Sequence, residues 1–277
     1  MRQRPVVGQT PGDHGDRRHH RHSVRRDSVP WYVQPGNRPD GASEQRGHDL
    51  ATVDAVGLTT RELNARLKEL AGSGEAEITI LNPQARHNIA VGIFDNCKIK
   101  INGSVGYFAA SLLDGPDVAI DGNAGWALGD NMMSGKISLT KDAGASVAST
   151  MRGGELFVGG NAGARAGISM KGGSLIVGGN SGFLTGFMMQ KGRIIVCGNV
   201  GEAVGDSMYE GTIYVAGEIA SLGSDAKTEE ISEDEVIDVL AALENHGITK
   251  PYTFTKVVSA KRLYNYDSLE RLEKAII

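Results

Sequence analysis

Methionine is the residue type whose spacing first suggests chemistry in this 277-residue chain. Five of the eight Met residues recur at every nineteenth position, namely Met132, Met151, Met170, Met189 and Met208. Thioethers stacked in a column could bind Cu(I), which is a soft metal ion. Met is also a flexible side chain that fills irregular gaps in hydrophobic cores. Leu113 occupies the equivalent position one interval earlier, and we interpret the column as core filler.

Asparagine forms a second column with the same interval. Its members are Asn123, Asn161, Asn180 and Asn199, with Asp142 between the first two. Stacked amides can hydrogen-bond from one repeat to the next, and they can also bind a ligand. We interpret this column as structural.

The other reactive residue types form no catalytic constellation. Cys97 and Cys197 are too few for a disulfide framework, a four-Cys zinc site or a Cys-ligated iron–sulfur cluster. We interpret both as packing residues. His246 lies far from His87 in sequence, and these are the two His residues beyond position 48. Asp130 and Asp206 share a column but lie four repeats apart, which is roughly 19 Å at about 4.8 Å per strand. We therefore predict no catalytic, cofactor-binding or metal-binding residue in this chain.

Composition narrows the class of protein. The 38 Gly residues make up about 14% of the chain, roughly twice the usual share of about 7%. The 29 Lys and Arg nearly balance the 33 Asp and Glu, for a net charge of −4, which argues against a nucleic-acid binder. No apolar run approaches the ~20 residues that span a bilayer. We expect a soluble cytoplasmic protein that binds neither nucleic acid nor membrane.

The segment 1–48 differs from the remainder of the chain. It holds 9 Arg, 5 His and 5 Pro but no Ile, Leu or Phe, so it has little apolar area to bury. We predict a disordered basic tail over residues 1–50. The run at residues 17–22 (RRHHRH) leaves open a nucleic-acid arm or a metal-binding His tract, and no apolar stretch comes after it as a twin-Arg export signal requires. A further hypothesis is that the working protein starts near Ala51.

The central region is a repeat with a period of nineteen. Its unit reads G-N-x-G-x-x-x-G, then about five residues, another Gly and a short strand, and no insertion breaks it over six cycles. One Gly column contains Gly160, Gly179, Gly198 and Gly217, and Lys141 occupies the same column one interval before Gly160. Another contains Gly129, Gly167, Gly186 and Gly205, with Ala148 at the intervening position and Ala110 one interval before Gly129. We expect these glycines at corners that need positive φ or close backbone approach.

The strand segments determine the predicted fold. Two alternating columns are aliphatic without exception and must face a common interior: Ile99, Val118, Ile137, Leu156, Leu175, Ile194 and Ile213, then Ile101, Ile120, Leu139, Val158, Val177, Val196 and Val215. One period is too short for a strand–helix–strand unit of ~30 residues. The leucine-rich pattern is absent, and the calcium-binding nonapeptide Asp is missing from residues 159–163. The sequence predicts an all-β protein, a right-handed parallel β-helix of about seven coils over residues 77–222.

The outward column of these strands becomes apolar in the later repeats. It ends with Phe157, Ile176, Ile195 and Tyr214, which are our candidate interface residues. An apolar stripe on the outside of a protein is normally covered. Either the C-terminal segment folds back over it, or it is covered by a partner subunit.

Small helices are predicted on both sides of the repeat. Residues 51–76 are expected to be a helical lead-in, with a helix within 57–75 that starts with the capping-box pair Thr59 and Glu62. Residues 223–277 are expected to be a C-terminal helical cap and docking segment, in which Ser232 and Glu235 repeat that spacing. Residues 251–258 are predicted to be extended and 268–277 a final short helix.

The repeat resembles a known domain. Residues 160–180 (GNAGARAGISMKGGSLIVGGN) and 211–217 (GTIYVAG) are similar to the GXGXG domain, which closes the large subunit of glutamate synthase and also occurs as a separate subunit of formylmethanofuran dehydrogenase. The resemblance covers about residues 77–220. Residues 233–236 (EDEV) and 254–257 (FTKV) resemble the segment after the β-helix in glutamate synthase.

The resemblance implies a non-catalytic β-helix subunit of a glutamate synthase-like complex, including the N-methylglutamate synthase type. The partners would be a class II glutamine amidotransferase-like subunit and an FMN-binding subunit, and FMN and iron–sulfur clusters would lie on those partners, with no cofactor in this chain. Two alternatives stay open: a β-helix subunit of a formylmethanofuran dehydrogenase, and a structural β-helix protein without partners.

Overall fold

The computed structural model describes residues 51–261. The predictions of a basic tail at 1–50 and of a helix at 268–277 lie outside these residues. The described part contains one 11-stranded sheet with the strand order β1-β2-β3-β4-β5-β6-β7-β8-β9-β11-β10, together with two helices. Neither helix is long and apolar enough to cross a membrane.

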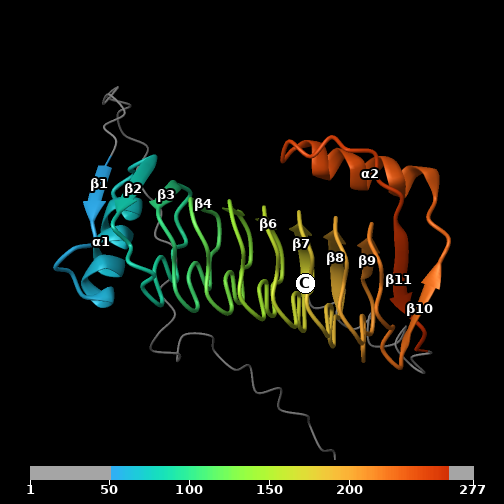
Figure 1. Ribbon diagram of the computed structural model, residues 1–277. Helices are drawn as coiled ribbons and strands as arrows, with labels where there is room; N and C mark the ends of the chain where they lie inside the picture. The colour runs from blue at the N-terminus through green and yellow to red at the C-terminus, as the bar shows by residue number, and fades with distance from the viewer. Residues whose placement is uncertain (1–50, 262–277) are drawn as a thin grey trace, which may run out of the picture. The chain divides into compact units, whose positions relative to one another are not determined.

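The repeat winds into a stack of coils, each of which contributes one strand (Figure 1). These strands are β3 (Lys98–Asn102), β4 (Asp117–Ile120), β5 (Lys136–Leu139), β6 (Glu155–Val158), β7 (Lys171–Val177), β8 (Lys191–Val196) and β9 (Thr212–Val215). Each strand pairs in parallel with the next, and the partners of Val118 are Ile99 and Ile137, one period away on either side. The prediction of a parallel β-helix of about seven coils is confirmed.

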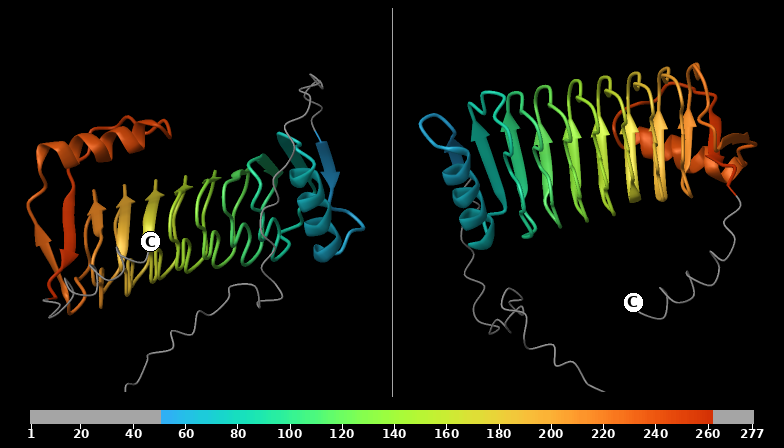
Figure 2. Two further views of the ribbon diagram at one scale, coloured as in Figure 1. Left: turned by 180° about the vertical axis from the view of Figure 1, so that it is seen from behind. Right: turned by 90° about the horizontal axis from the view of Figure 1, so that it is seen from below.

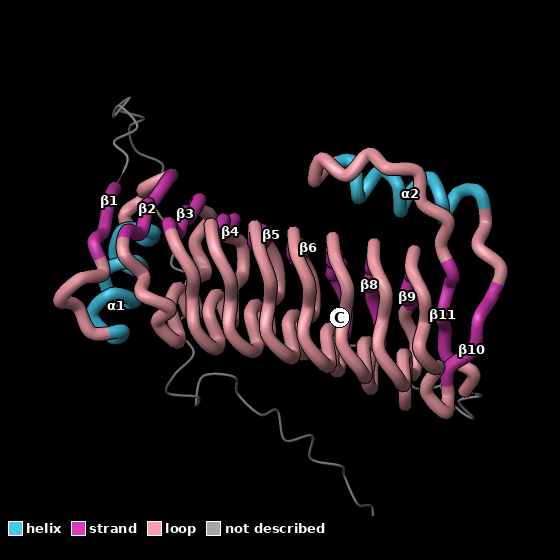
Figure 3. The backbone as a smooth tube through the Cα atoms, viewed as in Figure 1, coloured by secondary structure: helices cyan, strands magenta, loops and turns pink. Residues whose placement is uncertain are grey.

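The interior of the coils is the hydrophobic core. Both aliphatic columns are buried, as is the Met column, in which Met132, Met151, Met170, Met189 and Met208 are all 0% exposed. The interpretation of Met as core filler is therefore confirmed. Most of each coil is loop rather than strand, and the two helices belong to the segments before and after the coils (Figure 3).

Asparagine side chains connect successive coils along one corner. The backbone N–H of Asn180 donates to Oδ1 of Asn161 at 2.9 Å, and the N–H of Asn199 donates to Oδ1 of Asn180 at 2.8 Å. In the same way, the backbone N–H of Asn161 donates to Oδ1 of Asp142. A Cβ atom on Gly198 would lie 2.3 Å from Oδ1 of Asn180, so the glycine before Asn199 lets the amide reach the next coil. The structural interpretation of this column is confirmed.

The N-terminal end contains a strand that was not predicted. The segment expected to be a helical lead-in consists of β1 (Ala51–Asp54) and α1 (Thr60–Gly72), which precede β2 (Glu77–Leu81). β1 pairs in parallel with β2 and so extends the sheet by one strand. The capping box of Thr59 and Glu62 is present, and α1 buries its Leu residues in the main core.

The C-terminal end reverses the strand direction. β11 (Thr255–Ser259) pairs antiparallel with β9, and β10 (Ala226–Glu229) pairs antiparallel with β11. Between them lies α2 (Glu233–Glu244), with the predicted capping box of Ser232 and Glu235. α2 lies alongside the later strands of the stack in each view (Figure 2). The extended segment predicted over residues 251–258 forms a strand only from Thr255 onward.

Candidate functional site

The four candidate interface residues form one continuous stripe across neighbouring strands. Phe157, Ile176, Ile195 and Tyr214 are register partners on β6, β7, β8 and β9. They pack in one cluster with Val239, Ala242, Leu243 and Phe254 of the C-terminal segment. Ile176 and Ile195 are 0% exposed. The sequence left open whether the C-terminal segment or a partner subunit covers the stripe. In the structure the C-terminal segment covers it, so the stripe is an interface within the chain.

Polar contacts set the position of α2 on the stripe. Tyr214 Oη on β9 donates to Glu235 Oε1 at 3.0 Å, Arg193 on β8 pairs with Asp238, and Glu155 on β6 lies 3.1 Å from Nε2 of His246. From residue 235 to residue 246 a helical rise of about 1.5 Å per residue gives about 16 Å. Three strand spacings of about 4.8 Å give about 14 Å. α2 therefore runs back along the stack and passes about one strand per helical turn.

His246 has a structural role that the amino-acid sequence did not reveal. Its imidazole stacks on the Phe157 ring, with centroids 4.1 Å apart and planes 8° apart, and this contact covers the first member of the stripe, on β6. The segment that contains His246 does not repeat, so no spacing signal could have paired it with Phe157.

Burial and hydrogen bonding shift the pKa values of three groups at the contact between α2 and the strands. Burial, together with the hydrogen bond to Glu235, raises the pKa of Tyr214 to about 12. Lys256, whose Nζ lies 2.7 Å from Glu235 Oε1, and the Ser232 N–H lower the pKa of Glu235 to about 2. Burial also raises the pKa of the Cys197 thiol, which disfavours the nucleophilic thiolate. This arrangement suits a fixed structural contact rather than proton transfer.

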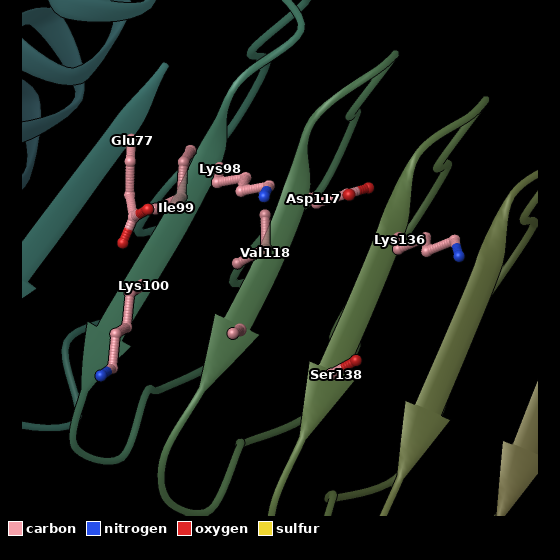
Figure 4. Close-up of a pocket in the computed structure, with 9 residues that line it drawn as sticks. Glu77, Lys98, Ile99, Lys100, Asp117, Val118, Lys136 and Ser138 are labelled. Atoms are coloured by element: carbon pink, nitrogen blue, oxygen red, sulfur yellow. The ribbon is translucent and has the colours of Figure 1, made fainter. Parts of the chain in front are cut away.

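The same face of the sheet is open over the earlier strands. There the outward column consists of small and polar residues. The first residues of β2, β3, β4 and β5 are register partners and alternate in charge: Glu77, Lys98, Asp117 and Lys136. These side chains line a shallow hollow of about 250 Å³, over which they project from successive strands (Figure 4). None of the four makes an ion pair with another residue in 51–261. The hollow is a charged surface with no His or Cys in its lining.

The remaining candidate residues are occupied by structural contacts. Asp130 accepts hydrogen bonds from the side chains of Asn131 and Thr150, and Asp206 accepts one from the backbone N–H of Ser224. Both Cys residues are free and buried. Across residues 51–261 no group of three or more His, Cys, Asp or Glu side chains is placed to hold a metal ion.

An exposed aromatic stack on the turns was missed from the sequence. His87, Tyr107 and Trp126 stack on one another, with centroid separations of 4.4 Å and 5.3 Å. Tyr107 and Trp126 are 42% and 59% exposed. Tyr107 and Trp126 are one period apart and so share a column, which was the available signal.

Comparison with known proteins identifies the repeat. The GXGXG motif family matches residues 79–271 of this chain. Protein GlxC of Rhizobium meliloti (strain 1021) is similar to it, with 38% identity over 64 residues, which are 23% of this chain and 28% of that protein. The shared segment thus spans less than a third of GlxC. Because the family match extends over well more than half of the chain and includes every coil from β3 to β9, this protein belongs to the GXGXG motif family.

Proposed function

We propose that this chain is a non-catalytic framework subunit of a glutamate synthase-like complex. In this role it holds a class II glutamine amidotransferase-like chain and an FMN-binding glutamate synthase-like chain in position for the formation of glutamate or N-methylglutamate. The observation that carries the proposal is the family match over residues 79–271. The resemblance of these residues to the β-helix domain of the glutamate synthase large subunit, which extends to the segments at 233–236 and 254–257, supports the choice of complex.

The recurring polar residues support a framework role. The Asn column is used to connect coils, and the charged residues at α2 are used to hold the helix on the stripe. A side chain that is committed to such contacts is poorly placed to act on a substrate. The chemistry would then be carried by the partner chains, together with their FMN and iron–sulfur clusters.

The coil stack suits the task of fixing a distance. Six intervals separate β3 from β9, and at about 4.8 Å each they hold the first and last coils about 29 Å apart. Because every coil hydrogen-bonds to its neighbours through strands, corners and Asn side chains, this spacing resists bending. A partner docked at each end would therefore keep a constant separation.

Native purification tests the proposal. The full-length chain, tagged at its chromosomal locus, is isolated under native conditions, and co-purifying chains are identified by mass spectrometry while released flavin is measured by fluorescence. We expect both an amidotransferase-like and an FMN-binding chain, and glutamine-dependent glutamate or N-methylglutamate formation by the complex but not by the isolated chain. A Leu175→Asp variant, which breaks the core, is the control for folding-dependent capture.

Three results would contradict the proposal. Recovery of neither partner would remove it. Molybdenum or tungsten in the complex would favour the formylmethanofuran dehydrogenase alternative. A stable homo-oligomer without other chains would favour a structural protein that works alone.

A further inference from the structure

A patch of large apolar side chains lies exposed on the turns of two early coils. It consists of Tyr107, Phe108, Leu112 and Trp126, which we call the apolar patch and which are 42%, 47%, 42% and 59% exposed. The first three belong to one six-residue turn segment, and Trp126 occupies the position of Tyr107 in the next coil. Single exposed apolar residues are ordinary, whereas a contiguous group marks an interaction site.

The repeat itself shows that the fold does not need these side chains. The middle coils have the same backbone and place small or polar residues at the equivalent positions. Tyr107 and Trp126 correspond to Ala145 and Ala164, Phe108 corresponds to Ser146, and Leu112 corresponds to Asn131, Thr150 and Ser169. The coils at those positions close with the same parallel bridges, such as Ala124 with Ala143 and Ala143 with Ala162. The large residues therefore serve something other than winding the chain.

Two members of the patch are also held in an unfavourable backbone conformation. Phe108 and Leu112 both have φ of 56°, in the left-handed region. Asn and Gly tolerate this region, and bulky side chains are disfavoured there. Asn131 occupies the position of Leu112 in the next coil with φ of 55°. The two bulky side chains of the early coil are therefore both disfavoured by their backbone conformation and exposed to solvent.

The aromatic side chains are rigid before any partner binds. The Tyr107 ring is sandwiched between His87 and Trp126, and the Tyr107 N–H donates to Nδ1 of His87 at 2.8 Å. The Trp126 ring continues over the next coil, since a Cβ atom on Gly144 would lie 2.7 Å from its Cδ1. Aromatic side chains that lose little freedom on binding are typical of interface hot spots.

An exposed carboxylate, that of Asp114, follows the apolar patch in the chain. Asp114 is two residues beyond Leu112 and is exposed, and Asp130, whose carbonyl accepts the Leu112 N–H, is half-buried. We propose that the apolar patch is the docking site for a partner subunit whose contact surface is an apolar pocket rimmed by Lys or Arg side chains. This inference rests on the proposed function and assigns one of its two partner contacts to the first coils of the stack.

The test uses the full chain and the amidotransferase-like and FMN-binding chains, each purified separately. The sequence has two Trp residues, so a Trp31→Phe background makes Trp126 the sole indole fluorophore. We expect one partner to shift the Trp126 emission to shorter wavelength. A Tyr107→Ala/Trp126→Ala variant should weaken that partner's Kd by at least about 30-fold, the size of a hot-spot loss. Melting temperatures report whether each variant folds.

Phe183 supplies the matched control. It lies in the column of Tyr107 and Trp126 three coils beyond Trp126 and is 47% exposed, so Phe183→Ala removes a similar surface elsewhere on the stack. We expect it to leave that Kd within about twofold. Asp114→Asn should weaken binding several-fold at low salt and have little effect at high salt, because added salt screens the rim charges.

The outcomes separate the two proposals. The docking site is wrong and the framework function stands if the Tyr107→Ala/Trp126→Ala variant binds with normal Kd and the Trp126 emission of the Trp31→Phe protein does not change when the complex forms. If neither chain binds the wild-type protein, the framework function fails and the inference fails with it. Self-association of the isolated chain that the double variant abolishes would replace the partner by a second copy.

Discussion

The outward and inward positions on one strand should respond very differently to the same substitution. Ile194 points into the coil and Ile195 points outward beneath α2, and both are 0% exposed. Ile194→Asp and Ile195→Asp introduce the same carboxylate at adjacent positions of β8. Local sequence and strand propensity therefore match between the two variants.

The structure predicts the two magnitudes. A fully buried carboxyl group can have its pKa raised by about 3–5 units, at about 1.36 kcal/mol per unit, so keeping it in the core costs about 4–7 kcal/mol. Removing the Ile side chain adds about 2–5 kcal/mol. The sum at Ile194 is comparable with the whole stability of a domain, about 5–15 kcal/mol. At Ile195 the loss is limited to the docking free energy of α2. Its large buried side chains, Val239 and Leu243, contribute at most about 3–6 kcal/mol.

Hydrogen exchange measured by mass spectrometry distinguishes the two responses. For Ile195→Asp we expect the amides of α2 to exchange rapidly while those of β3–β8 keep their protection. For Ile194→Asp we expect protection to fall throughout the coils. Ile195→Val, which keeps the apolar contact, should leave both sets protected. Equal loss of protection and of thermal stability in the two Asp variants would refute the inward and outward assignment.

Three further predictions concern α2 and the corners of the coils. The folded pKa of Glu235, about 2, lies below its ordinary value of 4.5, so its stabilising contact with Lys256 is complete above about pH 4.5 and is lost as the pH falls toward 2. Glu235→Gln should abolish this acid dependence in thermal melts followed by circular dichroism. Asn180→Ala removes a hydrogen-bond acceptor between coils and should lower the free energy of unfolding by about 0.5–1.5 kcal/mol in urea titrations, whereas Asn180→Asp, which keeps an acceptor oxygen between two Asn neighbours, should lower it less. Gly186→Ala places a Cβ atom at φ of 73° and 2.4 Å from a core side chain of a later coil, and should cost about 1–3 kcal/mol. Ala148→Gly, in the same column, should show no such loss, and equal losses in these two variants would contradict the role assigned to the column.

Much of the coil stack could be predicted because its contacts follow one rule. In the repeat the partner of each residue on the next coil is one period further along the chain, so a column of Met, Asn or Ile in the sequence is also a column in space. The capping boxes were predictable for a related reason, since their partners are three residues apart.

The parts that could not be predicted depend on segments that do not repeat. β1 was missed because it pairs with β2 across an intervening helix, and its register, in which Ala51 is the partner of Ile78, does not share the period of the coils. The stacking of Tyr107 and Trp126 could have been predicted from their spacing of one period. Their exposure could not, because it depends on which turns other segments of the chain leave uncovered. The sequence showed that the outward column is polar in the earlier repeats, but it did not indicate that these side chains line a hollow.

The sequence by itself determined the winding of this protein, which column of side chains lies inside, and the existence of an apolar stripe outside. It left open whether the C-terminal segment or another subunit covers that stripe. Only the tertiary structure decided this, by placing α2 so that Asp238 meets Arg193 and His246 meets Glu155. The physical reason is that periodic contacts repeat a local interval, whereas the position of α2 depends on single pairings 45 and 91 residues apart that occur once in the chain.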